Sequence, residues 1–370
     1  MLVTGGAGFI GSNFIRFWSG RHPEDHITNL DRLTYAGNLE NLVEVEGRTS
    51  YKFVHGDICD GKLIEELFQA EGFDCVVHFA AESHVDRSIL GPEVFIHTNV
   101  QGTFTLLEAA RRWWFPPERR QKGRSGRLPG HPASVPKGFC FLQVSTDEVF
   151  GSLTAGDGAA TEASPYAPNS PYAASKAAAD HLVRSYQRTY GVPAVITNCS
   201  NNFGPYQFPE KLIPLVIHKA IHGEPIPVYG EGKNVRDWIY VDDHCLALET
   251  VLDRGLVGER YNVGGGNQWQ NIDVVHMICD RLDEKLGSAA PPRRSLIQFV
   301  DDRPGHDLRY AMDISKISRE LHWRPQKTLE TGLSSTIDWY LEHSDWVQRI
   351  TTGDYQNYFQ KQYGSRLSPR

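Results

Sequence analysis

Two adjacent acidic residues and a tyrosine–lysine pair are the side chains of this sequence best suited to catalysis. Asp147 and Glu148 follow an apolar run at 139–144, and Tyr172 and Lys176 come later in the pattern Tyr-x-x-x-Lys. A charged lysine lowers the pKa of a nearby phenol, so that the tyrosinate can take a proton from a hydroxyl group. Oxidation of an alcohol needs one base. An acid and a base at the same place therefore indicate that a second bond is made or broken.

Both patterns also have plain structural explanations. Acidic residues after a strand often form the cap and first turn of a helix, and a tyrosine and a lysine four residues apart can share a solvated helix by chance. Ser170 and Pro171 are typical of a helix start, which places Tyr172 and Lys176 on one face. The spacing alone favours the chance explanation, and the rest of the chain reverses that preference.

A glycine-rich turn near the first residue supplies this context. Gly5, Gly8 and Gly11 form G-x-x-G-x-x-G between a short predicted strand at 1–4 and an amphipathic stretch that runs through Trp18. Such glycines let the backbone approach a pyrophosphate, and the helix N-terminus supplies N–H groups and a positive dipole. The turn therefore predicts a dinucleotide site.

Asp31 indicates which dinucleotide is bound. It ends the next predicted strand, 20 residues after Gly11, where a carboxylate accepts hydrogen bonds from a ribose diol and repels a 2′-phosphate. NAD is therefore favoured over NADP, although the adjacent Arg32 could tolerate that phosphate. Asp57, after a third strand, is placed to contact the adenine or is simply a turn residue.

The alternation of apolar runs with helical patterns predicts an α/β fold, with a Rossmann-type, doubly wound parallel sheet and a smaller C-terminal α/β substrate lobe. Residues 1–200 are assigned to the NAD-binding domain, 201–364 mainly to the nucleotide-sugar lobe, partly interleaved with it, and 365–370 to a tail. Predicted strands cover 1–4, a run ending at 31, 51–56, 75–80, 138–144 and 192–199 in the first domain, and 227–229 and 261–263 in the lobe. Predicted helices cover 99–112, 172–190, 212–222, 243–253 and 273–286.

One segment does not fit this alternation. Residues 115–138 hold five prolines, four glycines and six lysines or arginines, but a single acidic residue. The segment joins a helix to a strand and is too long for a plain connection. A solvated surface loop is the favoured interpretation, and a basic docking site for an anionic partner is the alternative.

The composition is that of an ordinary globular protein, with 40% hydrophobic and 22% charged residues and a net charge of −7. This balance gives no support to a nucleic-acid or membrane partner. The six cysteines form no C-x-x-C, and no predicted helix is expected to pair histidines as H-x-x-x-H, so no metal site is predicted. Reduced thiols and the lack of a basic-then-apolar leader indicate a cytoplasmic protein.

Longer motifs make the sequence similar to a known family. They are GGAGFIG (5–11), AAESHVDRS (80–88), STDEV (145–149), YAASK (172–176), NCSNN (198–202), FPEKLIP (208–214), RDW (236–238) and DRPGHD (302–307). Through them the chain resembles the extended short-chain dehydrogenase/reductases of the NAD-dependent epimerase/dehydratase family, and within these the dTDP-glucose 4,6-dehydratases, from Met1 to about Gly364. The Thr-Asp-Glu triplet separates such dehydratases from related 4-epimerases.

The resemblance implies a reaction sequence. Tyr172, beside Lys176, would take the proton of the sugar 4-hydroxyl while hydride leaves C4 for NAD⁺, and Thr146 would hydrogen-bond the 4-oxygen. The 4-ketone acidifies C5. Glu148 would then take the C5 proton, and Asp147 would protonate the departing 6-hydroxyl. Hydride would return to C6, so that NAD is regenerated in each cycle and can stay tightly bound.

The resemblance also implies two sets of binding residues. Those for the cofactor are Gly5, Gly8, Phe9, Ile10, Gly11, Asp31, Arg32, Leu33, Thr34, Asp57, Ile58, Phe79, Ala80, Ala81, Ser83, Thr98, Tyr172, Lys176 and Asn202. Those for the substrate are Ser83, Thr146, Asn201, Lys211, Leu212, Pro227, Tyr229, Arg236, Asn271, Arg303 and His306. The two arginines suit a diphosphate because a guanidinium group presents paired donors.

The leading prediction is a hydro-lyase of nucleotide-sugar metabolism that converts dTDP-glucose to dTDP-4-keto-6-deoxy-glucose. By analogy with the family it is expected to be a homodimer, paired through the helices at 99–112 and 172–190. A dehydratase or 4-epimerase for another nucleotide sugar is one alternative. A catalytically inactive, NAD-binding sensor is another, against which the intact triplet and Tyr/Lys pair argue.

Overall fold

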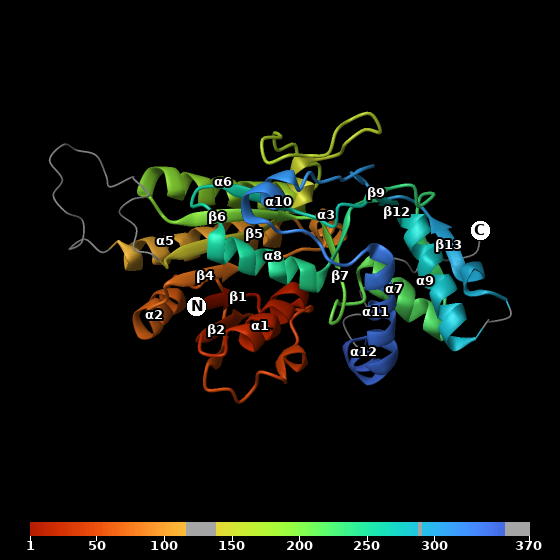
Figure 1. Cartoon of the computed structure of the whole chain (residues 1–370), viewed down its shortest axis with the longest axis horizontal. Helices are drawn as coiled ribbons and strands as arrows, with labels where there is room; N and C mark the ends of the chain where they lie inside the picture. The colour runs from red at the N-terminus through yellow and green to blue at the C-terminus, as the bar shows by residue number, and fades with distance from the viewer. Residues whose placement is uncertain (116–137, 288–290, 352–370) are drawn as a thin grey trace.

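The computed structural model describes residues 1–115, 138–287 and 291–351. A seven-stranded parallel sheet lies at the centre of the larger domain (Figure 1). Its strands are β1 (Leu2–Thr4), β2 (Ile27–Asp31), β3 (Tyr51–His55), β4 (Cys75–His78), β5 (Cys140–Thr146), β6 (Ala194–Cys199) and β11 (Arg260–Val263). They run in the order β11-β6-β5-β4-β1-β2-β3. Strands β1 to β3 follow one another toward one edge of the sheet, and strands from β4 onward follow toward the other edge. Such folds bind their ligands at this reversal of strand order, between β1 and β4.

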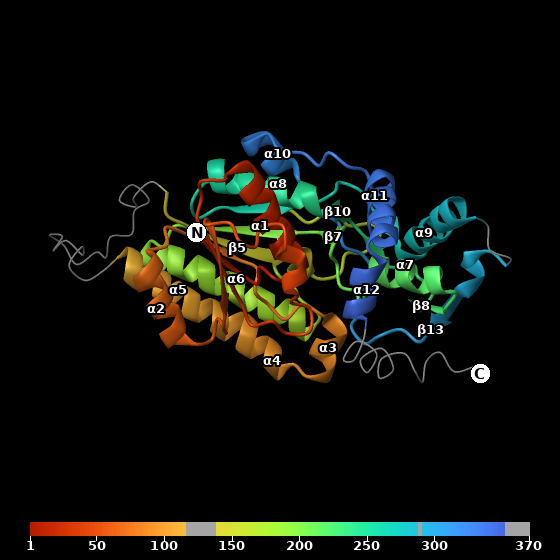
Figure 2. The same ribbon diagram turned by 90° about the horizontal axis from the view of Figure 1, so that it is seen from below.

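Helices cover both faces of this sheet (Figure 2). One face carries α1 (Phe9–Arg21), α8 (Val241–Arg254) and α10 (Ser315–Leu321), and the other α2 (Gly61–Glu71), α5 (Thr103–Trp114) and α6 (Pro171–Tyr190). Successive strand residues serve the two faces in turn: Val3 and Val77 join the first core, and Leu2 and Val76 the second. The prediction of a doubly wound, Rossmann-type sheet is confirmed.

The helix predicted at 99–112 begins earlier than expected. After α3 (Val85–Leu90), the chain turns through α4 (Glu93–Phe95) and a π-helical segment, η2 (Ile96–Gly102), that leads directly into α5. The wider turns of a π-helix break the 3.6-residue periodicity on which the prediction rested.

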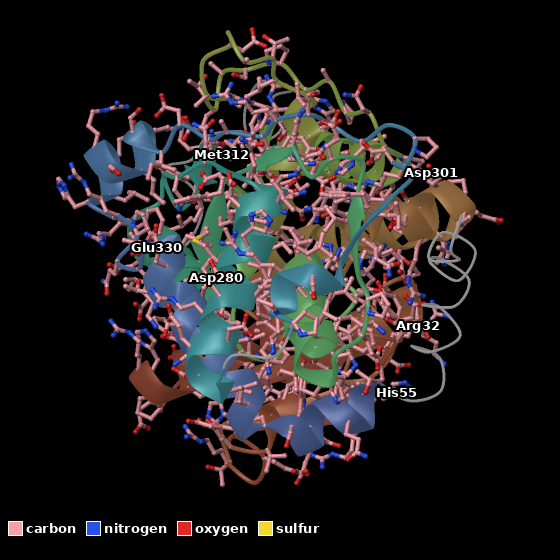
Figure 3. All side chains as sticks on the ribbon, turned by 90° about the vertical axis from the view of Figure 1, so that its right-hand side faces the viewer. Arg32, His55, Asp280, Asp301, Met312 and Glu330 are labelled. Atoms are coloured by element: carbon pink, nitrogen blue, oxygen red, sulfur yellow. The ribbon has the colours of Figure 1, made fainter. Side chains whose placement is uncertain are left out.

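The second lobe packs helices against two-stranded sheets and lies beside the large sheet, on the right in Figure 1. Its helices are α7 (Leu212–His222), α9 (Asn271–Leu286), α11 (Leu329–Glu342) and α12 (Ser344–Ile350). Its strands are β7 (Asn201–Phe203) with β10 (Trp238–Tyr240), β8 (Ile226–Tyr229) with β13 (Ile297–Val300), and β9 (Val235–Arg236) with β12 (Trp269–Gln270). Figure 3 views this lobe from its outer end, with Asp280 of α9 and Glu330 of α11 labelled.

The chain returns to the first domain after residue 200. The strand at 261–263 was predicted in the C-terminal lobe, and this was wrong, because β11 pairs in parallel with β6 at the edge of the large sheet. Tyr261 is fully buried there, in the same core as Leu248 of α8. A strand that pairs with a distant partner leaves no local mark of which sheet it joins. The boundary at residue 200 therefore stays a prediction.

Two predicted segments lie outside the described residues, namely 116–137 of the basic segment and the tail at 365–370. Across the ranges that the structure does describe, no helix has the length and apolar character needed to cross a membrane.

Candidate active site

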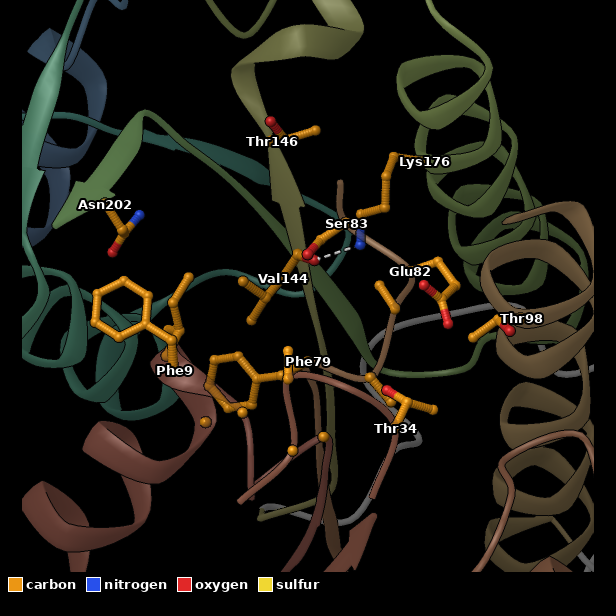
Figure 4. Close-up of a pocket in the computed structure, with 18 of the residues that line it drawn as sticks. Phe9, Thr34, Phe79, Glu82, Ser83, Thr98, Val144, Thr146, Lys176 and Asn202 are labelled. Atoms are coloured by element: carbon orange, nitrogen blue, oxygen red, sulfur yellow. Dashed lines mark hydrogen bonds between the residues drawn. The ribbon is translucent and has the colours of Figure 1, made fainter. Parts of the chain in front are cut away.

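The glycine turn borders a cavity of about 310 Å³. The cavity is lined by residues that follow β1, β2, β3, β4 and β5, with others from α6 and the start of the second lobe. In Figure 4, Phe9 and Asn202 lie on one side of it and Glu82 and Thr98 on the other. A cavity of this size beside the strand-order reversal is the expected place for a dinucleotide.

The glycines of the turn are required by close backbone contacts. A Cβ atom on Gly11 would overlap the carbonyl oxygen of Gly5. Gly5 itself has φ 72°, and a Cβ there would lie 2.6 Å from the backbone nitrogen of Ala80. Helix α1 begins after Gly8 without a side-chain cap, so N–H groups of its first turn are available to an anion. The turn thus fits the pyrophosphate of a dinucleotide.

Asp31 lies in the cavity wall as predicted, at the end of β2. Its carboxylate accepts hydrogen bonds from the backbone N–H groups of Ala7 at 2.9 Å and Leu33 at 2.8 Å. Leu33, predicted to contact the cofactor, is not among the lining residues of the cavity. Its backbone N–H binds Asp31, and its φ is 53°.

Arg32, the residue that left NADP open, lines the cavity but already has a protein partner. Its guanidinium group pairs with Asp57 at 3.0 Å. Arg32 and His55 lie together at the surface in Figure 3, where a ring nitrogen of His55 is 3.0 Å from the backbone oxygen of Arg32. This pairing agrees with the preference for NAD that Asp31 indicated.

Helix α6 and strand β5 bring the predicted catalytic side chains together. Lys176 Nζ donates a hydrogen bond to the backbone oxygen of Val144 at 2.8 Å, drawn as a dashed line in Figure 4. Strand β5 runs two residues further than predicted, because Ser145 and Thr146 pair with β6. All five predicted catalytic residues, Thr146, Asp147, Glu148, Tyr172 and Lys176, line the same cavity.

Asp147 and Glu148 form a short 3₁₀ turn, η5 (Asp147–Phe150), directly after β5. Thr146 caps it, since its Oγ1 accepts a hydrogen bond from the backbone N–H of Glu148 at 3.2 Å. The same hydroxyl donates to Asp147 Oδ1 at 3.2 Å. Asp147 Oδ2 is buried without a hydrogen-bond partner among the described residues. The cap interpretation of these acids is therefore confirmed, and it is compatible with the catalytic interpretation, which stays a prediction.

The surroundings of the two carboxyl groups differ. Burial, and next the charge of Glu148, raises the pKa of Asp147 well above its usual value. Burial also raises the pKa of Glu148, but Arg303, Lys211 and Arg236 oppose this. Asp147 is therefore the group that keeps a proton, and Glu148 is the group that cations help to ionise.

The expected effect of Lys176 on Tyr172 is not the dominant one. The pKa of Tyr172 is raised well above its usual value, first by burial and then by Glu148, whereas a hydrogen bond with Thr146 lowers it. The prediction of a lowered phenol pKa was therefore wrong for the protein alone. Burial is a property of the fold, which the Tyr-x-x-x-Lys spacing does not reveal.

The predicted substrate residues fall into two groups. Ser83, Thr146, Asn201 and Lys211 line the cavity, whereas the remainder do not. This second group is Leu212, Pro227, Tyr229, Arg236, Asn271, Arg303 and His306. Most of its members belong to α7, β8, β9 and α9 of the second lobe. Their role in substrate binding stays a prediction.

The two arginines proposed for a diphosphate already have protein partners. Arg303 pairs with Asp86 at 2.8 Å. Arg236 is buried, donates to the backbone oxygen of Asp307 at 2.9 Å and stacks over Tyr310 at 4.3 Å. Both guanidinium groups nevertheless lower the pKa of Glu148, the candidate general base, as described above.

Other cavity residues were absent from the predicted set. They include Glu82, Cys199, Ser200, Gln207, Phe208 and Glu210. Most of them lie inside the family motifs identified in the sequence. Whole motifs would therefore have predicted these cavity residues, whereas the selected single positions did not. Burial raises the pKa of Glu82, which marks it as a cavity carboxyl group.

Possible metal ligands gather at two places. Helix α7 carries His218 and His222 one turn apart, with ring centres 4.5 Å from each other, so the expectation that no helix pairs histidines in this way was wrong. Ligand atoms of Asp57, Cys59 and His97 lie within 4.8 Å of one another. Asp57 is paired with Arg32, and burial raises the pKa of the Cys59 thiol to about 12.

Comparisons with known proteins decide the family. A family model described as GDP-mannose 4,6 dehydratase matches residues 2–336. A dTDP-glucose 4,6-dehydratase of Xanthomonas campestris pv. campestris (strain B100) is 55% identical over 358 residues, which cover 96% of this chain and 97% of that protein. This chain belongs to the dTDP-glucose 4,6-dehydratase family. The resemblance inferred from the motifs is confirmed.

Solved structures of this dehydratase family share the fold. A dTDP-glucose 4,6-dehydratase of Streptomyces venezuelae, crystallised with NAD, is 46% identical with a TM-score of 0.82, over 94% of this chain and 99% of that one. One from Bacillus anthracis str. Ames, in complex with NAD, is 42% identical with a TM-score of 0.80, over 94% and 98% of the two chains.

The glycine contacts lead to a prediction for cofactor binding. Gly11→Ala should lower the amount of NAD bound about ten-fold or more, because the new Cβ displaces the turn that faces the pyrophosphate. Bound NAD per protein chain, measured after purification, tests this. Gly20→Ala is the matched control at the far end of α1, where a Cβ meets nothing within 4 Å. Equal NAD contents in the two variants would contradict the assignment of the turn.

Proposed function

We propose that this chain dehydrates dTDP-glucose to dTDP-4-keto-6-deoxy-glucose and uses NAD as its cofactor. The observation that carries the proposal is the buried Asp147, next to Glu148, in the same cavity as Tyr172 and Lys176. Oxidation of a hydroxyl group alone has no use for this second acid–base pair. Curated relatives at about the same length are named for the dehydration of this nucleotide sugar.

The chain's own groups can hold the cofactor in the required orientation. The glycine turn and the N-terminus of α1 would hold the pyrophosphate, and Asp31 would accept hydrogen bonds from the adenosine ribose. When bound, NAD would supply the acceptor for the C4 hydride. Its oxidised form would also add a positive charge to the site, which opposes the effect of burial on the pKa of Tyr172.

In the oxidation step, Tyr172 removes the proton of the sugar 4-hydroxyl. Thr146 lines the same cavity as Tyr172, so its hydroxyl is placed to hydrogen-bond the 4-oxygen. Lys176 contributes its charge from the following turn of α6. Because this charge lies in a buried site, it is screened less than it would be in water.

In the elimination step, the 4-ketone makes the C5 proton acidic, and Glu148 removes it. Asp147 gives its proton to the departing 6-hydroxyl, which leaves as water. The division of labour follows from the charges: Asp147 is buried beside a carboxylate, whereas Glu148 is near three cations. Hydride would then return to C6 while Glu148 gives its proton back to C5, so that the 4-keto-6-deoxy product forms and the cofactor would again be oxidised.

A dehydratase or 4-epimerase for a different nucleotide sugar is the alternative reading of the same site. A 4-epimerase also oxidises at C4, but it has no elimination step and needs no proton donor such as Asp147. An inactive sensor would need neither the acid–base pair nor the Tyr/Lys pair. The Thr-Asp-Glu triplet and the names of the relatives favour the dehydratase.

We also propose that the chain is a cytoplasmic homodimer. All six cysteines are free thiols, which suits a reducing compartment. Large apolar side chains are exposed on the helical face around α5 and α6: Ile96 is 52%, Phe104 39% and Tyr190 37% exposed. Such a face is suited to pairing with a second copy.

The dimer proposal predicts the effect of a surface charge. Phe104→Glu should give a monomer in sedimentation velocity, because a carboxylate cannot be buried unpaired in an apolar interface. Phe299→Glu is the control, since Phe299 is 60% exposed on β13 of the second lobe. A dimer that persists in Phe104→Glu would place the interface elsewhere.

The division of roles predicts separable steps. Glu148→Gln should still oxidise C4 of dTDP-glucose. Its rate of forming the 4-keto-6-deoxy product should fall by at least about 100-fold, because the C5 base is lost. Reduced cofactor should then accumulate on the enzyme and be visible by its absorbance. Asp147→Asn should behave similarly. If both variants keep full turnover, the site catalyses epimerisation or another reaction without elimination.

A further inference from the structure

Asp180 is a buried carboxyl group that the mechanism above leaves unused. It lies on α6, one helical turn after Lys176, and is fully buried. A buried carboxylate is costly unless it is hydrogen-bonded and opposed by a positive charge. Its surroundings therefore indicate what it does.

Three donors converge on one oxygen of Asp180. Oδ2 accepts hydrogen bonds from the hydroxyls of Ser145 and Tyr166, each at 2.7 Å, and from the amide of Asn198 at 3.4 Å. Asn198 also donates to the backbone oxygen of Thr146 at 3.0 Å. These donors come from β5, from the segment that precedes α6, and from β6. Donors converging in this way favour an ionised carboxylate.

Among the described residues, the titratable groups that β4, β6 and α6 place around Lys176 are neutral, apart from Asp180. On β4, burial and then Lys176 itself lower the pKa of His78 to about 3, so the ring is neutral. At the end of β6, burial raises the pKa of the Cys199 thiol to about 12. On α6, Tyr172 is likewise neutral in the protein alone, since burial raises its pKa.

Asp180 remains as the counter-charge. Burial lowers the pKa of Lys176, and the charge of Asp180 is the main influence that raises it. Lys176 and Asp180 are four residues apart on the same face of α6, and both are buried. In the other direction, burial raises the pKa of Asp180, and Lys176 is the largest influence that lowers it.

We propose that Asp180 is a positioning residue that keeps Lys176 charged beside Tyr172 and fixes α6 to the end of β5. It thereby sets the pH range over which the sugar hydroxyl is oxidised. The inference rests on the proposed function, because it takes Tyr172 to be the base of the oxidation step. It adds a residue that touches neither the cofactor nor the substrate cavity.

The direction of the effect follows from the charges. Without the Asp180 carboxylate, Lys176 loses its proton at a lower pH, and the tyrosinate loses its positive neighbour. Oxidation in Asp180→Asn should therefore fail at a lower pH than in the parent. Removing a nearby opposite charge shifts a pKa by about one unit or more, so the alkaline limb of the rate profile should move down by about one pH unit.

The experiment isolates oxidation by using Glu148→Gln as the parent, in which elimination is blocked. The rate at which reduced cofactor forms in a single turnover with dTDP-glucose is measured against pH, on protein with its bound NAD quantified. Asp180→Asn is compared with Tyr166→Phe in this background. Tyr166→Phe removes one hydrogen bond to Asp180 but keeps the charge and the aromatic ring, so its alkaline limb should stay in place.

Two results would overturn the inference. One is an alkaline limb of Asp180→Asn that does not move, and the other is an equal shift in Tyr166→Phe, which would mean that the cluster acts only as structural support. If the Glu148→Gln parent forms no reduced cofactor at all, the proposed function itself fails, and this inference with it.

A second measurement does not depend on folding of the Asp180 variant. In the Glu148→Gln protein labelled with ¹³C at lysine Cε, the Lys176 resonance is assigned by its loss in Lys176→Arg. It should report a charged ammonium group at neutral pH, although an unpaired buried lysine titrates at about 5–6. A neutral amine at neutral pH would contradict the role of Asp180.

Discussion

The hydrogen bond from Lys176 Nζ to the backbone oxygen of Val144, 2.8 Å long, fixes helix α6 to strand β5. Tyr172 lies one turn before this lysine on the helix, and Thr146 lies two residues beyond Val144 on the strand. One contact therefore sets the position of Tyr172, the proposed base of the oxidation, relative to Asp147 and Glu148, the proposed acid and base of the elimination. A buried ammonium group must find an acceptor, so the fold has little freedom to place these elements differently.

Burial gives the site its chemistry. It raises the pKa of Asp147, Glu148 and Tyr172 alike, and it strengthens every charge interaction that then distinguishes them. Cations from the second lobe act on Glu148, and the carboxylate of Asp180 acts on Lys176. The second lobe and the buried cluster behind β5 thus tune groups that the large sheet positions. This arrangement brings the groups proposed for oxidation and for elimination into a single cavity.

The parts of the structure that depend on neighbouring residues were predictable from the sequence. The sequence correctly located the glycine turn and Asp31 at the end of β2. It also correctly placed Tyr172 and Lys176 one helical turn apart. Features that depend on distant partners were not. Strand β11 joins the large sheet through β6, the direction of the pKa shift of Tyr172 comes from its burial, and three separate segments meet at Asp180. No local pattern records any of these.

The central claim is that hydride removed from C4 returns to C6 after water is lost. The most direct measurement uses dTDP-glucose that carries deuterium at C4, with the product followed by mass spectrometry and NMR. The predicted result is a product lighter by one water, with the deuterium at C6 and a ketone at C4. Deuterium that remains at C4 in a product of unchanged composition, or that is lost to solvent, would contradict the claim.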